Sequence, residues 1–256
     1  MSELTIPDRV LFFPVTAFDA AVLRPAGRVP VVAGAGGPLG HALDCARATQ
    51  KLGADGLLVL PPHLVGAPQA GLVAYVERVA AASDLPVIVY HRGNARFTPA
   101  SVAGLLQNPR VAGLKDGAGD VAVAQQFVLE AGRSGRDVLL FNGLLTAELS
   151  QAAYTAIGVP LYSSAAFAML PEMAVAFFAA HRAGDVVRQR ALLDGFSSPL
   201  IALRDETPGF AVSLVKAGVR LQGMPVGPVH APLTDPSPEQ VQRLARIVER
   251  GRELVA

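Results

Sequence analysis

The chain of 256 residues has no tryptophan, and Cys45 is its one cysteine. A single cysteine excludes a disulfide within the chain, and a lone thiol fits a reducing cytoplasm. Neither positive nor negative charge is in large excess, because the formal net charge is +1, and the basic residues form no stripe. Aromatic residues make up only 6%. Neither a phosphate-tracking surface nor a stacking platform is expected, so nucleic acid is not an expected partner.

Long hydrophobic runs are absent as well. No apolar segment is long enough to cross a bilayer, and residues 1–10 lack the basic and apolar regions of a signal peptide. We therefore expect a cytoplasmic protein with no membrane association. What the sequence does have is 51% hydrophobic and only 17% charged residues. This composition is compatible with a large core and with buried contacts between subunits.

Strand and helix patterns alternate through the first two thirds of the chain. Short apolar runs that do not alternate with polar residues are typical of strands covered on both faces of a parallel sheet. We expect such strands at 10–15, 29–36, 56–62, 86–92, 111–117, 138–143 and 159–166. The clearest helical patterns between them cover 41–52, 70–82, 99–107, 121–131 and 146–157. Repeated strand–helix units predict either a βα barrel or a doubly wound sheet.

The pattern changes after the last expected strand, because only helices are predicted there, at 171–184, 186–203, 208–221 and 237–255. We expect a βα barrel over residues 1–184 and a C-terminal helical extension over 185–256. One connection does not fit a complete barrel. Residues 19–27 join two strands in a few residues, whereas a parallel pair needs a crossover of about a dozen or more. The barrel is therefore predicted to lack one strand and its flanking helices near residues 19–29.

Lys115 is the strongest candidate for a catalytic residue. It ends the apolar run of VAGLKDG (111–117), and Tyr90 ends the preceding strand. A lysine buried at the mouth of a barrel has a lowered pKa, and its neutral amine can attack a carbonyl to form a Schiff base. A tyrosine on the neighbouring strand could then move protons. The alternative from spacing alone is a lysine that ends a strand and points into water.

Three other patterns are weaker. The glycines of GAGGPLG (34–40) could cradle a phosphate, but the next strand ends without the acid that a dinucleotide site needs, which favours a tight turn. His63 and His91 both follow strands, but no third ligand accompanies them, so no metal site is expected. Asp116 and Asp120 could be paired acids, although an aspartate that opens a helix is usually a cap.

Several motifs in order resemble one enzyme superfamily. FFPVTAFD (12–19), PVIVY (86–90), GLKDGAGD (113–120) and LYSSAAF (161–167) are similar to the dihydrodipicolinate synthase and N-acetylneuraminate lyase superfamily. Arg92, Asn94 and SLVKAG (213–218) resemble its 5-dehydro-4-deoxyglucarate dehydratase branch. The resemblance implies a TIM (β/α)8-type barrel with a C-terminal helical extension, a homo-oligomer (dimer or tetramer), and no metal or organic cofactor.

The resemblance also assigns residues. It implies that Lys115 forms the Schiff base, that Tyr90 shuttles protons and that Gly143 borders the imine site. It further implies that Thr16 lies beside the lysine and that two residues bind a substrate carboxylate, namely Ser163 and Ser164. The implied reaction is dehydration and decarboxylation of 5-dehydro-4-deoxy-D-glucarate to 2,5-dioxopentanoate.

Two departures from the family pattern keep alternatives open. The family's glycine–threonine–glycine–glutamate loop, which supplies N–H groups to the keto-acid carboxylate, is missing between Asp19 and Gly27. His63 and His91 also replace residues common in relatives. The alternatives are an aldolase of the same superfamily that releases pyruvate, and a remnant that folds and assembles with impaired catalysis.

Overall fold

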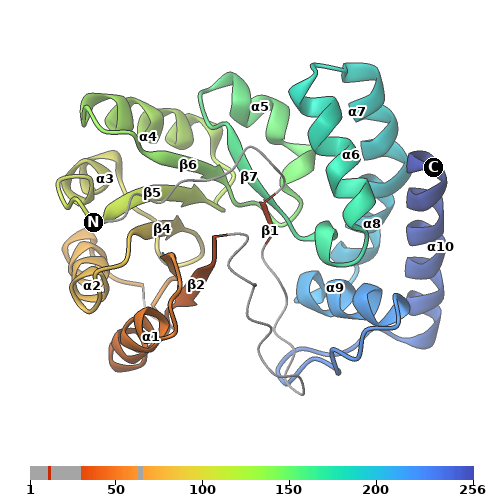
Figure 1. The fold of residues 1–256 in the computed structure, drawn as a ribbon, viewed down its shortest axis with the longest axis horizontal. Coiled ribbons are helices and arrows are strands. Elements are labelled where there is room, and N and C mark those ends of the chain that lie inside the picture. Colours follow the sequence, from red (N-terminus) through yellow and green to blue (C-terminus); the bar gives the residue numbers. More distant parts are fainter. Residues whose placement is uncertain (1–10, 13–29, 63–65) are drawn as a thin grey trace. The chain divides into compact units, whose positions relative to one another are not determined.

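The computed structural model describes residues 11–12, 30–62 and 66–256. The chain divides into two compact units (Figure 1). Of the described residues, the first unit comprises 30–62, 66–144 and 153–161, and the second comprises 11–12, 145–152 and 162–256. The expected division between a barrel ending at residue 184 and a helical extension stays a prediction.

A parallel sheet forms the centre of the first unit. Its strands pair in the order β2-β3-β4-β5-β6. They span Val32–Ala35 (β2), Gly56–Val59 (β3), Val87–His91 (β4), Val111–Asp116 (β5) and Leu139–Asn142 (β6). Each of the first four is followed by a helix: α1 (Leu39–Lys51), α2 (Gln69–Ala81), α3 (Pro99–Leu105) and α4 (Val121–Arg133). Neighbouring helices pack side by side along one face of the sheet (Figure 1).

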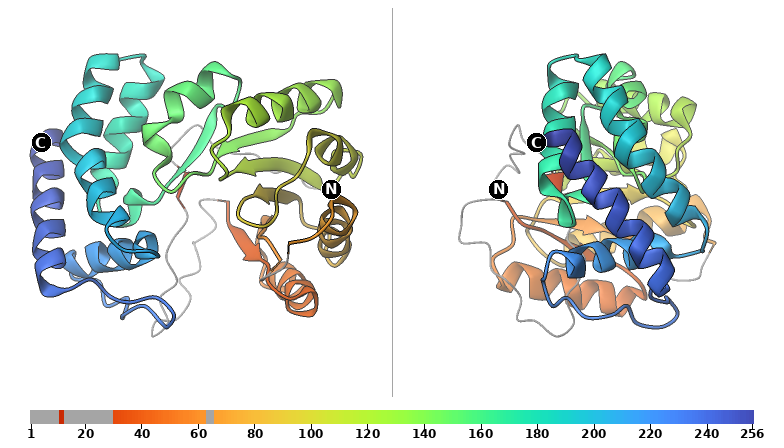
Figure 2. Two further views of the ribbon diagram at one scale, coloured as in Figure 1. Left: turned by 180° about the vertical axis from the view of Figure 1, so that it is seen from behind. Right: turned by 90° about the vertical axis from the view of Figure 1, so that its right-hand side faces the viewer.

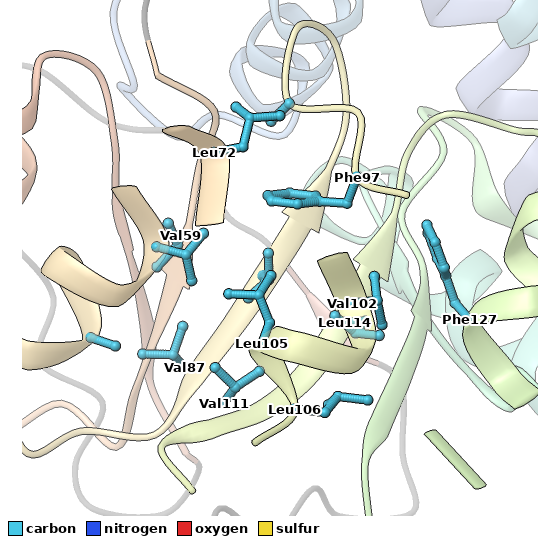
Figure 3. Close-up of a cluster of buried hydrophobic side chains, with 14 of the residues drawn as sticks. Val59, Leu72, Val87, Phe97, Val102, Leu105, Leu106, Val111, Leu114 and Phe127 are labelled. Carbon is cyan, nitrogen blue, oxygen red and sulfur yellow. The ribbon is translucent and has the colours of Figure 1, made fainter. Parts of the chain in front are cut away.

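The core of this unit lies between the sheet and its helices (Figure 3). Val59, Val87 and Val111 project from three neighbouring strands and are almost fully buried. Leu72 of α2 and Leu105 of α3 pack into the same cluster. Full burial of a side chain of this size contributes about 1.5–3 kcal/mol to stability. The non-alternating apolar runs of the sequence are explained by strands buried on both faces.

Local signals fix where the helices begin. Thr98 caps α3 by accepting a hydrogen bond from the Ser101 backbone N–H, and Pro99 follows it at the first helical position. Asp120 caps α4 by accepting bonds from the N–H groups of Ala122 and Val123, both at 3.1 Å. The expectation that Asp120 is a cap is therefore confirmed.

The glycine-rich turn after β2 is shaped by close packing. A Cβ atom at Gly36 would lie 2.6 Å from Cβ of Leu60, and Gly37 has a φ of +82°. Both positions favour glycine for steric reasons. These contacts support the tight-turn interpretation of GAGGPLG.

The second unit is mainly helical. It contains η1 (Ala147–Leu149), η2 (Ala166–Ala168), α6 (Pro171–Arg182), α7 (Val186–Leu192), η3 (Leu193–Ser197), α8 (Ser198–Asp205), α9 (Phe210–Leu221) and α10 (Pro238–Val255). Helix α5 (Gln151–Ala156) and strand β7 (Leu161–Ser164) each cross the division between the units. Strand β1 (Leu11–Phe12) pairs in parallel with β7, with Leu11 opposite Ser163. Helix α10 packs across α6, α8 and α9 (Figure 2).

Strands β2 to β7 lie within the ranges expected for them, and of the strand expected at 10–15 the structure describes Leu11–Phe12. Two helix expectations need correction. The single helix expected at 186–203 is divided into α7, a π-helical turn (η3) and α8. Pro199 lacks a backbone N–H and stands at the start of α8, so a regular helical ladder cannot run through it. The helix expected at 146–157 is likewise divided at Ser150 into η1 and α5.

Two further expectations concern the gap in the barrel and the absence of a membrane-spanning segment. Residues 19–29, where a strand and its flanking helices are expected to be missing, lie outside the described residues. Across the described residues, no helix has both the length and the apolar character to span a bilayer.

Candidate active site

Lys115 and Tyr90 face each other across two neighbouring strands of the first unit. In the parallel pairing of β4 with β5, Tyr90 is the partner of Lys115 and His91 is the partner of Asp116. Partnered residues of adjacent strands project their side chains to the same face of a sheet. The Lys115 Nζ accordingly lies 4.9 Å from the centroid of the Tyr90 ring. An amine and a phenol therefore share one site.

Both groups are withdrawn from water, since Lys115 is 5% exposed and Tyr90 is 6% exposed. Burial and, to a smaller extent, the positive charge of Arg92 together lower the pKa of the Lys115 amine to about 7. About half of the amine is then neutral near pH 7, which is the form that attacks a carbonyl. Burial raises the pKa of the Tyr90 phenol, although Arg92 opposes that shift. The phenol therefore keeps its proton at neutral pH and can donate it.

Two glycines make room for this pair. A Cβ atom at Gly143 would lie 2.6 Å from both Cε and Cγ of Lys115, and 2.9 Å from Cε2 of Tyr90. A Cβ atom at Gly117 would lie 2.8 Å from Cε2 of Tyr90. The carbonyl of Gly143 also accepts a hydrogen bond of 2.6 Å from the Tyr90 hydroxyl. Gly143 therefore acts on the site through its missing side chain and its carbonyl.

Arg92 completes the surroundings of the phenol. Its Nη1 donates to the Tyr90 hydroxyl at 3.1 Å, and its guanidinium carbon lies 5.6 Å from the Tyr90 ring centroid. The phenol oxygen thus donates to Gly143 and accepts from Arg92. Two hydrogen bonds fix the direction in which its proton points.

Asp116, which follows Lys115 directly, holds the loop after β5. Its buried carboxylate accepts hydrogen bonds from the Tyr154 hydroxyl and from the Ala118 N–H, the latter at 3.0 Å. Burial raises the pKa of the Tyr154 phenol, and its hydrogen bond to the Asp116 carboxylate acts in the same direction. Asp116 is therefore part of the support of the site.

His91 is explained by its structural contacts. Its Nδ1 accepts a hydrogen bond of 3.0 Å from the Phe97 backbone N–H, and its ring meets the Phe127 ring edge to face at 5.0 Å. Burial lowers the His91 pKa, so the ring is neutral near pH 7. His63 lies outside the described residues, and the part of the chain that is described contains no group of three possible metal ligands.

The remaining predicted site residues belong to the second unit or lie outside the described residues. Ser163 and Ser164 are buried on β7 in the second unit, where the Ser164 hydroxyl accepts a bond of 3.2 Å from the Phe167 N–H. Their role in binding a carboxylate stays a prediction. Thr16 lies outside the described residues. The structure therefore brings Lys115, Tyr90 and Gly143 together.

Sequence reasoning missed the roles of Arg92, Gly117 and Tyr154 in this site. Arg92 stands two residues after Tyr90, and the period of two along a strand could have placed both on one face. Gly117 carried the weaker signal of a glycine directly after a polar strand end. No sequence signal links Tyr154 to Asp116, because 38 residues separate them.

Comparison with known proteins identifies the family to which this chain is similar. Residues 15–250 match the dihydrodipicolinate synthetase family. The probable 5-dehydro-4-deoxyglucarate dehydratase 1 of Streptomyces coelicolor is 53% identical over 238 residues, which cover 92% of this chain and 75% of that protein. The resemblance stated from the sequence motifs is therefore confirmed.

Solved structures share the fold. Dihydrodipicolinate synthase from Oceanobacillus iheyensis superposes with a TM-score of 0.79 at 22% identity, over 89% of this chain and 74% of that one. YagE from E. coli K12, solved in complex with pyruvate, superposes with a TM-score of 0.72 at 24% identity, over 90% and 77%. The expected α/β barrel-type fold class is confirmed by these matches. The chain belongs to the dihydrodipicolinate synthetase family.

Proposed function

We propose that the chain is a lyase that dehydrates and decarboxylates 5-dehydro-4-deoxy-D-glucarate to 2,5-dioxopentanoate through an imine on Lys115. The identity to the Streptomyces coelicolor dehydratase supports this reaction. The observation that carries the proposal is the buried amine of Lys115, whose pKa is about 7, beside the phenol of Tyr90. This is the pair that Schiff-base chemistry needs near neutral pH.

The reaction begins when the neutral Lys115 amine attacks the C5 carbonyl and water leaves, which gives a protonated imine. Because this imine withdraws electrons, a proton leaves C4 to form an enamine, whose electrons then expel hydroxide from C3. Tyr90 is the general acid that protonates the departing hydroxide. Loss of the C1 carboxylate as CO2 leaves its electron pair in the conjugated system, which takes up a proton at C4. The enol at C2 then tautomerises to the aldehyde, and hydrolysis of the imine releases the product and the free lysine.

Carboxylate binding is the second task of the site. Ser163 and Ser164 are proposed to donate hydrogen bonds to a substrate carboxylate, and Thr16 is proposed to lie beside the lysine. Such preorganised donors contribute to rate by fixing the reacting carbon against the amine. Gly143 borders the imine site, where any larger side chain would displace Lys115.

We also propose that the chain acts in the cytoplasm as a homo-oligomer. Its low fraction of charged residues, 17%, is compatible with buried contacts between subunits. Its single cysteine is compatible with a reducing cytoplasm. Several large apolar side chains are exposed on the described chain, including Val187 at 82% and Leu52 at 72%. A second copy of the chain could cover such side chains.

The direct test is product formation from 5-dehydro-4-deoxy-D-glucarate. The chain should release CO2 and 2,5-dioxopentanoate, and Lys115→Ala should abolish both. Lys51→Ala, which removes an exposed lysine at the end of α1, is the matched control and should leave turnover unchanged. Release of pyruvate instead would establish the aldolase alternative. Turnover by Lys115→Ala would contradict the proposal.

A further inference from the structure

Arg92 differs from other arginines of the described chain in what it binds. Arg110, Arg220 and Arg243 each form an ion pair with a carboxylate. The half-buried Arg92 contacts the hydroxyl and the ring face of Tyr90. Among the described residues, no ion pair joins its guanidinium to a carboxylate.

This cation and the reacting amine both lie against the ring of Tyr90. The Arg92 guanidinium carbon lies 5.6 Å from the Tyr90 ring centroid and the Lys115 Nζ lies 4.9 Å from the same point. Two groups that can both be positive repel each other when partly withdrawn from water. An anion placed between them would relieve this repulsion.

The buried carboxylate of Asp116, the residue after Lys115, is already engaged. Asp116 is partnered with His91 across the strands, and its carboxylate accepts bonds from Tyr154, Ala118 and Gly119. These donors hold the carboxylate at the loop after β5. The site therefore presents a guanidinium beside a phenol and an amine, with the local carboxylate committed to the backbone.

We infer that Arg92 binds the carboxylate adjacent to the keto group of an α-keto acid held on Lys115. This inference rests on the proposed function. The carboxylate of an α-keto acid is bonded directly to the carbon that Lys115 attacks, so it lies next to the imine, and both Lys115 and Arg92 lie against the ring of Tyr90. Arg92 already donates to that phenol, and its planar fork matches the two oxygens of a carboxylate.

The test compares pyruvate with pyruvamide, which has the same keto group but no negative charge. Each probe is incubated with the full chain and borohydride, and the concentration that gives half-maximal adduct on Lys115 is measured. Arg92→Gln should raise this concentration about 10- to 100-fold for pyruvate, and less than about threefold for pyruvamide. Any effect of the substitution on the lysine itself changes both probes alike, so the ratio between them isolates the carboxylate.

Two further variants are controls for the role of Arg92. Arg92→Lys keeps the charge but loses the fork, so it should give an intermediate loss for pyruvate alone. Arg96→Gln removes an exposed arginine of the same loop and should change neither probe.

The outcomes separate the two proposals. If wild type traps both probes and Arg92→Gln changes them equally or not at all, the inference about Arg92 is wrong while the imine remains. If wild type traps neither probe, the proposed function fails and the inference fails with it.

Discussion

At the scale of single residues, the account depends on the cost of burying an amine. Lys115 was found from the sequence because an apolar run ending in lysine and glycine is compatible with a buried strand end. Its environment could not be predicted from composition, since it depends on the partner strand. Arg92 illustrates the same limit, because its contact with Tyr90 depends on how the chain leaves β4.

Replacing the buried amine should stabilise the protein. The folded chain holds the Lys115 pKa at about 7, below its ordinary value of 10.5. Between these values the unfolded chain binds more protons, so the lysine destabilises the fold most below about pH 7 and progressively less as the pH rises. Lys115→Met should therefore raise the free energy of unfolding by about 2–4 kcal/mol at pH 6, with a much smaller gain at pH 10.

Urea denaturation at the two pH values measures this difference. Lys51→Met is the control, because an exposed lysine should change stability by less than about 0.5 kcal/mol. A Lys115→Met gain that is the same at both pH values would show that the amine is not held in its neutral form.

At the scale of elements, strand register makes the site. Tyr90 and Lys115 meet because β4 and β5 pair in parallel with these two residues opposite each other. The sequence predicted both strands but not their register, because their apolar runs carry no alternation that would fix it. The sequence did not predict the π-helical turn η3 inside the expected 186–203 helix, because the apolar period continues through this turn. Pro199, at the start of α8, was the one local sign of it.

The loop that follows β6 should tolerate no side chain at Gly143. Gly143→Ala would place a Cβ atom 2.6 Å from the Lys115 side chain, so the lysine must move. We expect borohydride trapping of pyruvate to slow by at least about tenfold, because misplacement of a reacting group by about 1 Å is costly. Gly132→Ala in α4 has no neighbour within 4 Å and should trap pyruvate at the wild-type rate. Equal rates in the two variants would show that Gly143 does not shape the site.

At the scale of the whole molecule, the order of strands and helices was predictable and the completeness of the barrel was not. Six of the expected strands are described in full as β2 to β7, the strand expected at 10–15 is described at Leu11–Phe12, and the family match extends over residues 15–250. The short connection near residues 19–29 was identified by counting residues against the length of a crossover. The residues of this short connection lie outside the described residues, so the structure does not show how the barrel wall is completed.

The proposed assembly is tested by the mass of the particle in solution. Light scattering at micromolar concentrations should give two or four times the mass of one chain. The physical reason is that exposed apolar side chains such as Val187 are less costly when another subunit covers them. A particle with the mass of a single chain across that range would contradict the proposal.

The central claim is that Lys115 forms an imine with an α-keto acid, and one measurement tests it most directly. The chain is treated with pyruvate and borohydride from pH 5 to 9, digested, and its peptides are weighed. The account predicts a mass increase of one reduced pyruvate unit on the peptide that contains Lys115, with an initial rate that rises through about pH 7. An adduct on another lysine, or no adduct at any pH, would contradict it.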